Sequence, residues 1–355
     1  MQNKKILIAD DVEMNRDMLT EILEDDYQIE TVDDGEKAIK VLSERIDEFA
    51  VLLLDLVMPN KDGFAVLKVM NEEGWIDKLP VLIISGEQSI QSEKDCFNWG
   101  VSDFIRKPFD DTLVKKRVGN VAELSLYRRS LEKKVEEQTQ RLKAINENIV
   151  DILGSVVESR SLESGQHIQR VKGYTKILAF EMMDAYKEYE LTKEKIDVIV
   201  SASSLHDIGK VAIPDNILLK PGRFTPEEFE IMKTHTTRGC ELLEGIKGNW
   251  DEEYNKVSWE ICRYHHERYD GKGYPDHLVG EEIPISAQLV SIADVYDALI
   301  SKRCYKDAYE LEEAYNMILN GECGTFSPKL IECFKRSKDK FEALALDKDL
   351  MEIKQ

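Results

Sequence analysis

The first 118 residues alternate short apolar runs with stretches whose apolar residues recur at helical spacing, and this alternation restricts the possible folds most. The runs are leucine-rich or β-branched and span residues 5–9, 28–32, 50–54, 81–84 and 101–105. Helical stretches such as 14–23 and 35–42 separate them. Because near-continuously apolar strands separated by helices form parallel sheets covered on both faces, we predict a doubly wound α/β domain with five parallel strands. Its functional residues should lie at the carboxyl ends of the strands.

The segment from about residue 110 to residue 157 is predicted to form one long helix, because it contains no proline and only two glycines. Its apolar residues recur three or four positions apart: Leu124, Tyr127, Leu131, Val135, Leu142, Ile145, Ile149, Ile152 and Val156. The step from Leu131 to Val135 is a four-residue stutter in this pattern. We interpret residues 119–157 as a coiled-coil linker that pairs with its twin in a homodimer. A helix lying on its own domain is the alternative.

Residues 158–355 show helical patterns and few candidate strands, so we predict an all-α second domain. The clearest helical patterns are 195–204, 225–236, 259–265, 286–301 and 311–319. A chain of 355 residues is also longer than a domain with a single hydrophobic core usually is, which favours two domains.

Charge and cysteine usage exclude several classes of protein. With 69 acidic and 48 basic residues the net charge is −21, which argues against a non-specific DNA-binding protein. No apolar run approaches the ~20 residues of a membrane span, and none has the length of a signal-peptide core. The six cysteines form no Cys-x-x-Cys pair, as is typical of reduced thiols. We therefore expect a cytoplasmic protein with neither DNA nor membrane as a partner.

Charged and hydroxyl side chains follow four of the five predicted strands. Asp10 and Asp11 follow the first strand, Asp55 ends the third, Ser85 ends the fourth and Lys107 follows the fifth. At the common edge of a parallel sheet three carboxylates repel one another unless a hard cation such as Mg²⁺ neutralises them. A lysine and a hydroxyl beside such a carboxylate make a site that can accept a phosphoryl group.

Together with Asp62-Gly63, Phe104 and Pro108-Phe109, these positions resemble the receiver domain of two-component response regulators. The resemblance covers residues 1–118 and implies a flavodoxin-like fold, with a sensor histidine kinase as the partner. It also implies that Asp55 is the phosphorylated residue.

By the same resemblance, Mg²⁺ would be held by Asp10, Asp11 and Asp55. Ser85 and Lys107 would bind the phosphoryl oxygens, and Phe104 would be the aromatic switch residue.

Five of the six histidines lie in contexts typical of metal ligands. Glu163 and His167 are four residues apart and share one face of a helix. His206-Asp207 follows an apolar run, and the other candidates are His235, His265-His266 and the apolar-flanked Asp294. Imidazoles and carboxylates from several helices, with no thiolate nearby, suit Fe, Mn, Zn or Ni. His277 is expected in a surface loop.

The pair His206-Asp207 resembles the HD superfamily of metal-dependent phosphohydrolases. Residues 265–275, which read HHERYDGKGYP, look like an intact HD-GYP signature, and the resemblance extends over most of 158–335. It implies hydrolysis of cyclic di-GMP to linear pGpG, and often on to GMP. Cys304 departs from the family pattern, since proline is usual there.

The resemblance also implies a ligand set: Glu163, His167, His206, Asp207, His235, His265, His266 and Asp294. Glu163 corresponds to the extra glutamate of members that bind three ions, so two or three ions remain possible, with Fe or Mn favoured.

Catalytic and substrate-binding roles follow from the same pattern. Asp207 would bridge two ions, and Lys210 would act beside it on the substrate. Arg303 and Lys306 would face the substrate phosphates, as a clamp for the charge that develops on a transferring phosphoryl group. The turn formed by Gly273, Tyr274 and Pro275 would be a substrate lid or a docking surface, for example for a diguanylate cyclase domain.

We therefore predict a response regulator whose phosphorylation controls a cyclic di-GMP phosphodiesterase. A phosphodiesterase for another cyclic dinucleotide, such as cyclic GMP-AMP, is one alternative. A low-turnover sensor of cyclic di-GMP or a protein-docking module is another.

Overall fold

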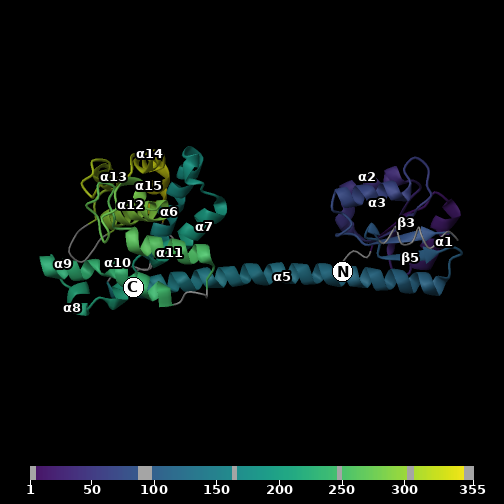
Figure 1. Ribbon diagram of the computed structural model, residues 1–355, viewed down its shortest axis with the longest axis horizontal. Helices are drawn as coiled ribbons and strands as arrows, with labels where there is room; N and C mark the ends of the chain where they lie inside the picture. The colour runs from purple at the N-terminus through teal and green to yellow at the C-terminus, as the bar shows by residue number, and fades with distance from the viewer. Residues whose placement is uncertain (1–4, 87–97, 162–165, 246–249, 302–307, 348–355) are drawn as a thin grey trace. The chain divides into compact units, whose positions relative to one another are not determined.

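The computed structural model describes residues 5–86, 98–161, 166–245, 250–301 and 308–347. The chain forms two compact units, Met1–Gln140 and Arg141–Gln355 (Figure 1). Helix α5, Asp111–Arg160, belongs to both units. The domain limits predicted near residues 118 and 158 both fall within this helix or at its end.

The first unit contains a five-stranded parallel sheet, as predicted. Its strands are β1 (Lys5–Ala9), β2 (Gln28–Val32), β3 (Phe49–Asp55), β4 (Val81–Ser85) and β5 (Asp103–Arg106). The strand order is β2-β1-β3-β4-β5, and every neighbouring pair is parallel. The central strand β3 is buried along its whole length, which explains its continuous apolar run.

Helices cover both faces of this sheet. Helices α2 (Gly35–Arg45) and α3 (Gly63–Glu72) pack on one face, and α1 (Glu13–Leu23) and the first turns of α5 pack on the other. A short 3₁₀ turn, Ile46–Glu48, links α2 to β3. The carboxylates of Asp34 and Asp62 accept hydrogen bonds from backbone N–H groups of the first turns of α2 and α3, so these two N-caps set where the helices begin.

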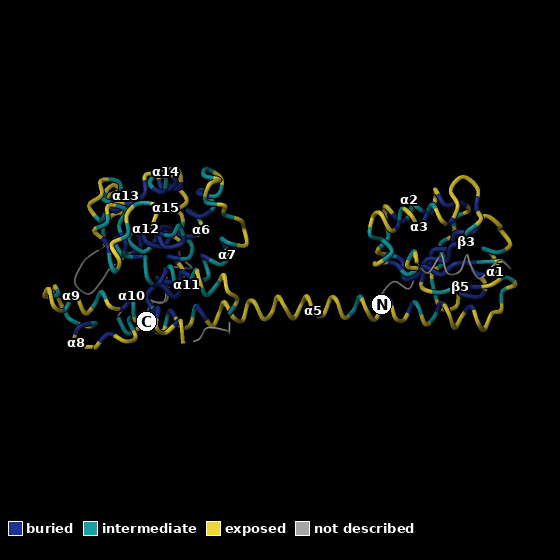
Figure 2. The backbone as a smooth tube through the Cα atoms, in the orientation of Figure 1, coloured by how far each residue is buried: buried dark blue, intermediate teal, exposed yellow. Residues whose placement is uncertain are grey.

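Helix α5 is 50 residues long, which confirms the predicted long helix. Residues 131–149 are all exposed, and Figure 2 shows this part of the helix in yellow. The apolar side chains of the predicted seam are exposed as well, with Leu142 at 60%. This exposure does not support a helix lying on its own domain, while the coiled coil stays a prediction.

The second unit is α-helical, as predicted. Its helices are α6 (Gln166–Ala185), α7 (Lys193–Ala202), α8 (Asp215–Leu218), α9 (Pro226–Lys233), α10 (His235–Gly245), α11 (Glu252–Tyr264), α12 (Ile285–Ile300), α13 (Leu311–Leu319), α14 (Pro328–Arg336) and α15 (Lys338–Ala345). Four 3₁₀ segments join them: η2 (Lys187–Tyr189), η3 (Ser203–Leu205), η4 (Ile208–Ala212) and η5 (Gly280–Glu282). Within the described part of this unit the strand-like pairing is a single bridge between Asp270 and Val279.

One predicted helix proves to be two. The pattern over residues 225–236 is divided at Thr234, because α9 ends at Lys233 and α10 begins at His235. Thr225 and Glu228 form a capping box, and Pro226 occupies the first helical position, so the start of α9 is well specified. The break brings His235 to the start of a new helix.

The core of the second unit fixes the helices that carry candidate ligands. Helix α12 is buried over most of its length and packs against α6, α11 and α13. Stacked and edge-on aromatic rings join α6, α12 and α15, with ring centroids of Tyr174 5.1 Å from Tyr296 and 4.6 Å from Phe341. The positions of His167 on α6 and Asp294 on α12 are therefore set by close packing.

Among the described residues, no helix combines the length and the apolar character that a membrane crossing requires. Four cysteines are free thiols: Cys240, Cys262, Cys323 and Cys333. Cys96 and Cys304 lie outside the described residues.

Candidate metal centre and receiver site

The predicted carboxylates and lysine meet at one edge of the sheet in the first unit. The Lys107 ammonium lies 2.7 Å from Asp55 Oδ2 and 3.0 Å from Asp10 Oδ2. Ligand atoms of Asp10, Asp11 and Asp55 all lie within 4.8 Å of one another, which suits a hard cation with oxygen ligands. Asp11 is exposed, whereas the other two carboxylates are buried.

Lys107 places a positive charge beside the two buried carboxylates of this edge. Burial raises the pKa of Asp55, although Lys107 opposes that shift. Burial lowers the pKa of Lys107, but the carboxylates of Asp55 and Asp10 outweigh burial and leave it raised. Ser85 ends β4 as predicted, and Phe104 is buried in the core on the face of the sheet that α2 and α3 cover.

The sequence reasoning missed Asn15 in this site. Its amide donates to both carboxylate oxygens of Asp10 at 3.0 Å, and it thereby orients them. Asn15 lies on α1, five residues after Asp10, and no motif marked it.

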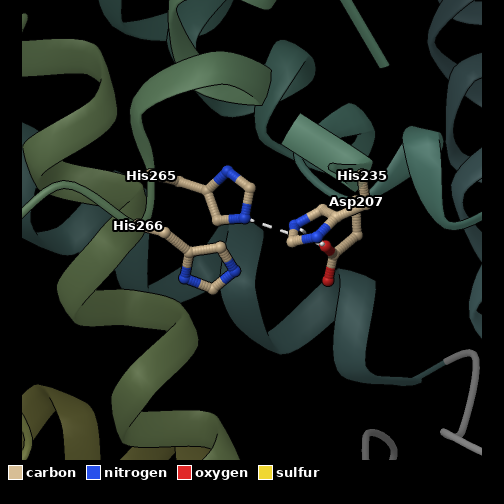
Figure 3. Close-up of side chains that lie close together, drawn as sticks. All are labelled: Asp207, His235, His265 and His266. Atoms are coloured by element: carbon tan, nitrogen blue, oxygen red, sulfur yellow. Dashed lines mark ion pairs between the residues drawn. The ribbon is translucent and has the colours of Figure 1, made fainter. Parts of the chain in front are cut away.

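In the second unit, four predicted ligands form a first metal-binding group. Asp207 Oδ1 lies 3.1 Å from His235 Nε2 and 3.7 Å from His265 Nε2. His266 completes the group, whose ligand atoms all lie within 4.8 Å of one another. In Figure 3, His235 and His265 point toward Asp207, with His266 beside them.

A second group lies on the other side of Asp207. The Nε2 atom of His206 is 3.2 Å from Asp207 Oδ2 and 3.9 Å from Asp294 Oδ1, and His167 Nε2 is 3.6 Å from Asp294 Oδ1. Glu158, in the last turn of α5, shares this group with His167 and His206. The two oxygens of Asp207 thus face different histidine groups, as a bridging ligand requires.

Backbone carbonyls fix how three of these imidazoles face the centre. The Nδ1 atom of His206 lies 2.8 Å from Ser203 O, that of His235 lies 2.7 Å from Met232 O, and that of His265 lies 3.0 Å from Ile261 O. Since a carbonyl only accepts, each Nδ1 carries a proton, so each Nε2 presents its lone pair when the imidazole is neutral.

These three Nε2 atoms are buried and have no hydrogen-bond partner in the described chain, and the same holds for Asp207 Oδ1. Buried polar atoms are normally satisfied, so a convergent set of lone pairs fits transition-metal ions.

The pKa values favour the neutral form of His265 and His266 and the protonated form of His206 in the metal-free protein. Burial lowers the pKa of both His265 and His266, which favours the neutral ligating form. Burial also lowers the pKa of His206, but the Asp207 carboxylate outweighs it and raises that pKa to about 10. Burial raises the pKa of Asp207, but Lys210 and His206 outweigh it and hold that pKa well below its usual range.

His167 is oriented by a carboxylate that the sequence reasoning assigned no role. Asp297 Oδ2 lies 2.7 Å from His167 Nδ1, and both oxygens of Asp297 accept from the Arg170 guanidinium. Asp297 is 1% exposed. It lies three residues after Asp294 on α12, so helical spacing places the two on one face but does not show that Asp297 contacts His167.

A pocket of about 1040 Å³ opens over this centre. Asp207, Lys210 and Tyr274 line it, and Lys220 and Arg223 lie on the wall formed by the loop before α9. The Lys210 ammonium lies 2.7 Å from Asp207 Oδ2. Polar groups at the metal-binding side and cations on the wall suit an anionic ligand.

Of the predicted Gly-Tyr-Pro turn, Tyr274 lines this pocket. The ring of Tyr274 packs 4.8 Å from that of His266, centroid to centroid. The buried Glu267 carboxylate accepts backbone hydrogen bonds from Asp276 and His277, which hold the turn in place. A Cβ at Gly273 would lie 2.3 Å from Arg268 N, so only glycine fits there. The neighbouring Pro275 is half-buried.

Three predicted site residues, Glu163, Arg303 and Lys306, lie outside the described residues. His277 is exposed in a loop, as predicted.

A cluster of carboxylates and a lysine at a parallel-sheet edge is typical of a receiver domain, and histidines around a buried aspartate are typical of a metal-dependent hydrolase. Residues 6–119 match the model of the response regulator receiver domain, and residues 165–329 match that of the HD domain.

Two relatives match nearly the whole chain, and a third matches part of it. A Vibrio cholerae protein named probable cyclic di-GMP phosphodiesterase is 36% identical over 353 residues, which cover 96% of this chain and 79% of the relative. A cyclic di-GMP phosphodiesterase response regulator of Xanthomonas campestris is 32% identical over 352 residues, which cover 96% of this chain and 89% of the relative. A 3′3′-cGAMP-specific phosphodiesterase of Vibrio cholerae is 41% identical over 203 residues, which cover 57% of this chain but only 37% of that relative.

The chain therefore belongs to the family of response regulators in which a receiver domain precedes a metal-dependent HD-domain phosphodiesterase.

Proposed function

We propose that this enzyme hydrolyses cyclic di-GMP to pGpG, with GMP as a candidate further product, and that phosphorylation of Asp55 controls its rate. The observation that carries the proposal is that the two oxygens of Asp207, which lines an open pocket, face different histidines. The names of relatives that match nearly the whole chain support cyclic di-GMP as the substrate.

The chain offers ligands for at least two ions, with Fe or Mn favoured and Zn or Ni possible. One ion would be held by Asp207, His235, His265 and His266, and another by His167, His206, Asp207 and Asp294. Such ions, when bound, activate water near neutral pH and stabilise charge on the attacking and leaving oxygens. By the family pattern Glu163 would serve a third ion.

The protein's own residues bind and orient the phosphodiester. Lys210 holds Asp207 in place and presents positive charge to the pocket. Because the whole chain carries a charge of −21, such local cations must attract a dianionic substrate at short range. We assign the same role to Arg303 and Lys306, and we assign Gly273, Tyr274 and Pro275 to the pocket wall or to docking of a diguanylate cyclase domain.

Cyclic GMP-AMP is the second candidate substrate, because a relative specific for that dinucleotide is 41% identical over 203 residues. The test incubates protein reconstituted with Mn²⁺ or Fe²⁺ under anaerobic conditions with each cyclic dinucleotide and resolves the products. We expect turnover of cyclic di-GMP and loss of turnover in Asp207→Ala. Faster turnover of cyclic GMP-AMP would reverse the assignment, and tight binding without product would identify a sensor or docking module.

For the receiver unit we propose that a sensor histidine kinase phosphorylates Asp55, with Mg²⁺ held by Asp10, Asp11 and Asp55. Ser85 and Lys107 would bind the phosphoryl oxygens, and Phe104 would change position in response. Beryllofluoride, which mimics an acyl phosphate, should change the hydrolysis rate of the parent and leave that of Asp55→Asn unchanged. An equal rate with and without beryllofluoride in the parent would contradict this control.

We also propose a homodimer through the exposed seam of α5. Apolar residues at heptad-like spacing stay exposed in a single chain, and a second copy would bury them. Leu142→Glu should convert a dimer to a monomer in light scattering, whereas Lys143→Glu, which changes an exposed position beside it, should not. A monomeric parent at micromolar concentration would contradict the proposal.

A further inference from the structure

Glu158 combines deep burial with an unusual position. It lies in the last turn of α5, the helix that begins in the first unit, and it is 1% exposed. One of its carboxylate oxygens lies within 4.8 Å of the ligating nitrogens of both His167 and His206, which are within the same distance of each other. A glutamate in a charged helix carries no sequence signal for such a site, so only the packing of α5 reveals it.

The end of α5 is held against the segment that carries His206 and Asp207. On the N-terminal side of that segment, the Ser204 hydroxyl donates to Asp151 at 2.7 Å. Gly154 approaches the same segment so closely that a Cβ would lie 2.3 Å from the Ser204 carbonyl oxygen. The position of Glu158 between these contacts and the helix end is therefore fixed by backbone packing.

On the C-terminal side of the segment, Arg160 closes the contact. Its guanidinium donates to the carbonyl of Val211 at 2.8 Å and pairs with Asp215 at 2.6 Å. Contacts on both sides of His206 and Asp207 hold this turn of α5 as a wall of the metal centre.

The donor atoms around Glu158 suit a metal ion. The Lys210 ammonium lies 2.7 Å from Asp207 Oδ2 and 3.7 Å from Glu158 Oε1, so it is hydrogen-bonded to Asp207 and lies farther from Glu158. A buried carboxylate is costly unless charge of the opposite sign is close by. One carboxylate oxygen and two imidazole nitrogens are a donor set that suits Mn, Fe or Zn.

We propose that Glu158 is a metal ligand, so that the last turn of α5 supplies one donor to the ion held by His167 and His206. The inference rests on the proposed metal-dependent hydrolase but not on the identity of its substrate. Because α5 is continuous from Asp111, the helix that leaves the receiver would carry a metal ligand at its other end.

The test compares metal binding in four full-length proteins: the parent, Glu158→Gln, Glu163→Gln and Glu147→Gln. Glutamine keeps the size of the side chain and removes the charge, and Glu147 is an exposed control on the same helix. Metal-free protein is titrated with Mn²⁺ under anaerobic conditions, and bound metal per chain is measured by elemental analysis. The melting temperature is recorded with and without Mn²⁺.

We expect Glu158→Gln to bind about one ion fewer per chain, or to need at least about 10-fold more free Mn²⁺ for that ion. Its melting temperature without metal should match the parent, and the increase on adding Mn²⁺ should be smaller. Glu147→Gln should behave as the parent does.

Two results would overturn the inference. One is unchanged metal stoichiometry and affinity in Glu158→Gln. The other is an equal loss of melting temperature with and without metal, which would make Glu158 a structural partner of Lys210. If Glu158→Gln does not fold, Glu158→Asp replaces it, and unchanged metal binding in that variant has the same meaning. Metal is counted without substrate, so a parent that hydrolyses neither cyclic dinucleotide would refute the proposed function and leave this test intact.

Discussion

Asp297 provides the sharpest test of how the second unit supports its metal centre. Its buried carboxylate holds the imidazole of His167 through Nδ1 and pairs with the guanidinium of Arg170. Asp297→Asn keeps the shape of the side chain but leaves a single oxygen acceptor. The amide nitrogen must then face either the Nδ1–H of His167 or the guanidinium of Arg170, both of which are donors.

The magnitude follows from these contacts. Breaking a buried ion pair by removing one partner costs about 3–5 kcal/mol, because the remaining charge stays buried. For a unit of about 200 residues, 1 kcal/mol corresponds to about 2–4 °C, so the melting temperature should fall by roughly 6–20 °C. Loss of the partner that orients a ligating histidine typically costs about 10–100-fold in metal affinity.

The assay is calorimetry on metal-free protein together with a Mn²⁺ titration, with Asp184→Asn as the control. Asp184 is exposed on α6, the helix that carries His167 and Arg170. A melting temperature within about 2 °C of the parent, together with unchanged Mn²⁺ affinity, would refute the reasoning that this carboxylate positions the ligand. A loss in stability alone would restrict Asp297 to a structural role.

Three further predictions concern the centre, the pocket and the linker helix. Asp207 raises the pKa of His206 to about 10 against the effect of burial, so an incoming ion must displace a proton from this imidazole. The Mn²⁺ affinity should therefore fall as the pH is lowered from about 8 to about 6. Proton release in a weakly buffered titration measures this, and an affinity independent of pH would contradict it. Gly273→Ala should destabilise the turn by about 1–3 kcal/mol and reduce turnover, because the added Cβ would meet the backbone of Arg268. The control is Gly245→Ala, whose Cβ has open space, and it should behave as the parent does in the same melting and activity assays. Inserting one alanine after residue 137 rotates the end of α5 by about 100°, so the response to beryllofluoride should disappear while basal hydrolysis remains. A seven-residue insertion adds about two full turns and should restore the response.

The parallel sheet and its functional edge could be predicted from the sequence because both depend on local order along the chain. Residues 5–9 are an apolar run and residues 28–32 are rich in β-branched side chains, and they form β1 and β2 with the predicted limits. Once the strands are parallel, residues that follow them must share an edge, so Asp10, Asp55 and Lys107 meet as expected. Asn15 was not predicted, because its hydrogen bond to Asp10 depends on the position of α1 beside that edge.

The histidine centre was predictable only in part. The residue types and the short spacing of His206-Asp207 and His265-His266 identified ligands, but spacing along the chain cannot show which ligands face one another. The tertiary structure decides that the two oxygens of Asp207 face different histidine groups.

The sequence by itself determined the order of the two units, the long helix between them and the residue types of each site, because helical and strand periodicity and the spacing of motifs are local properties. Tertiary packing alone decided that Asp297 supports His167 and that α5 ends beside His206, with Glu158 among the metal-binding side chains. These contacts join residues that lie far apart in the chain, and close packing of α5, α6 and α12 around one buried cluster of charges creates them.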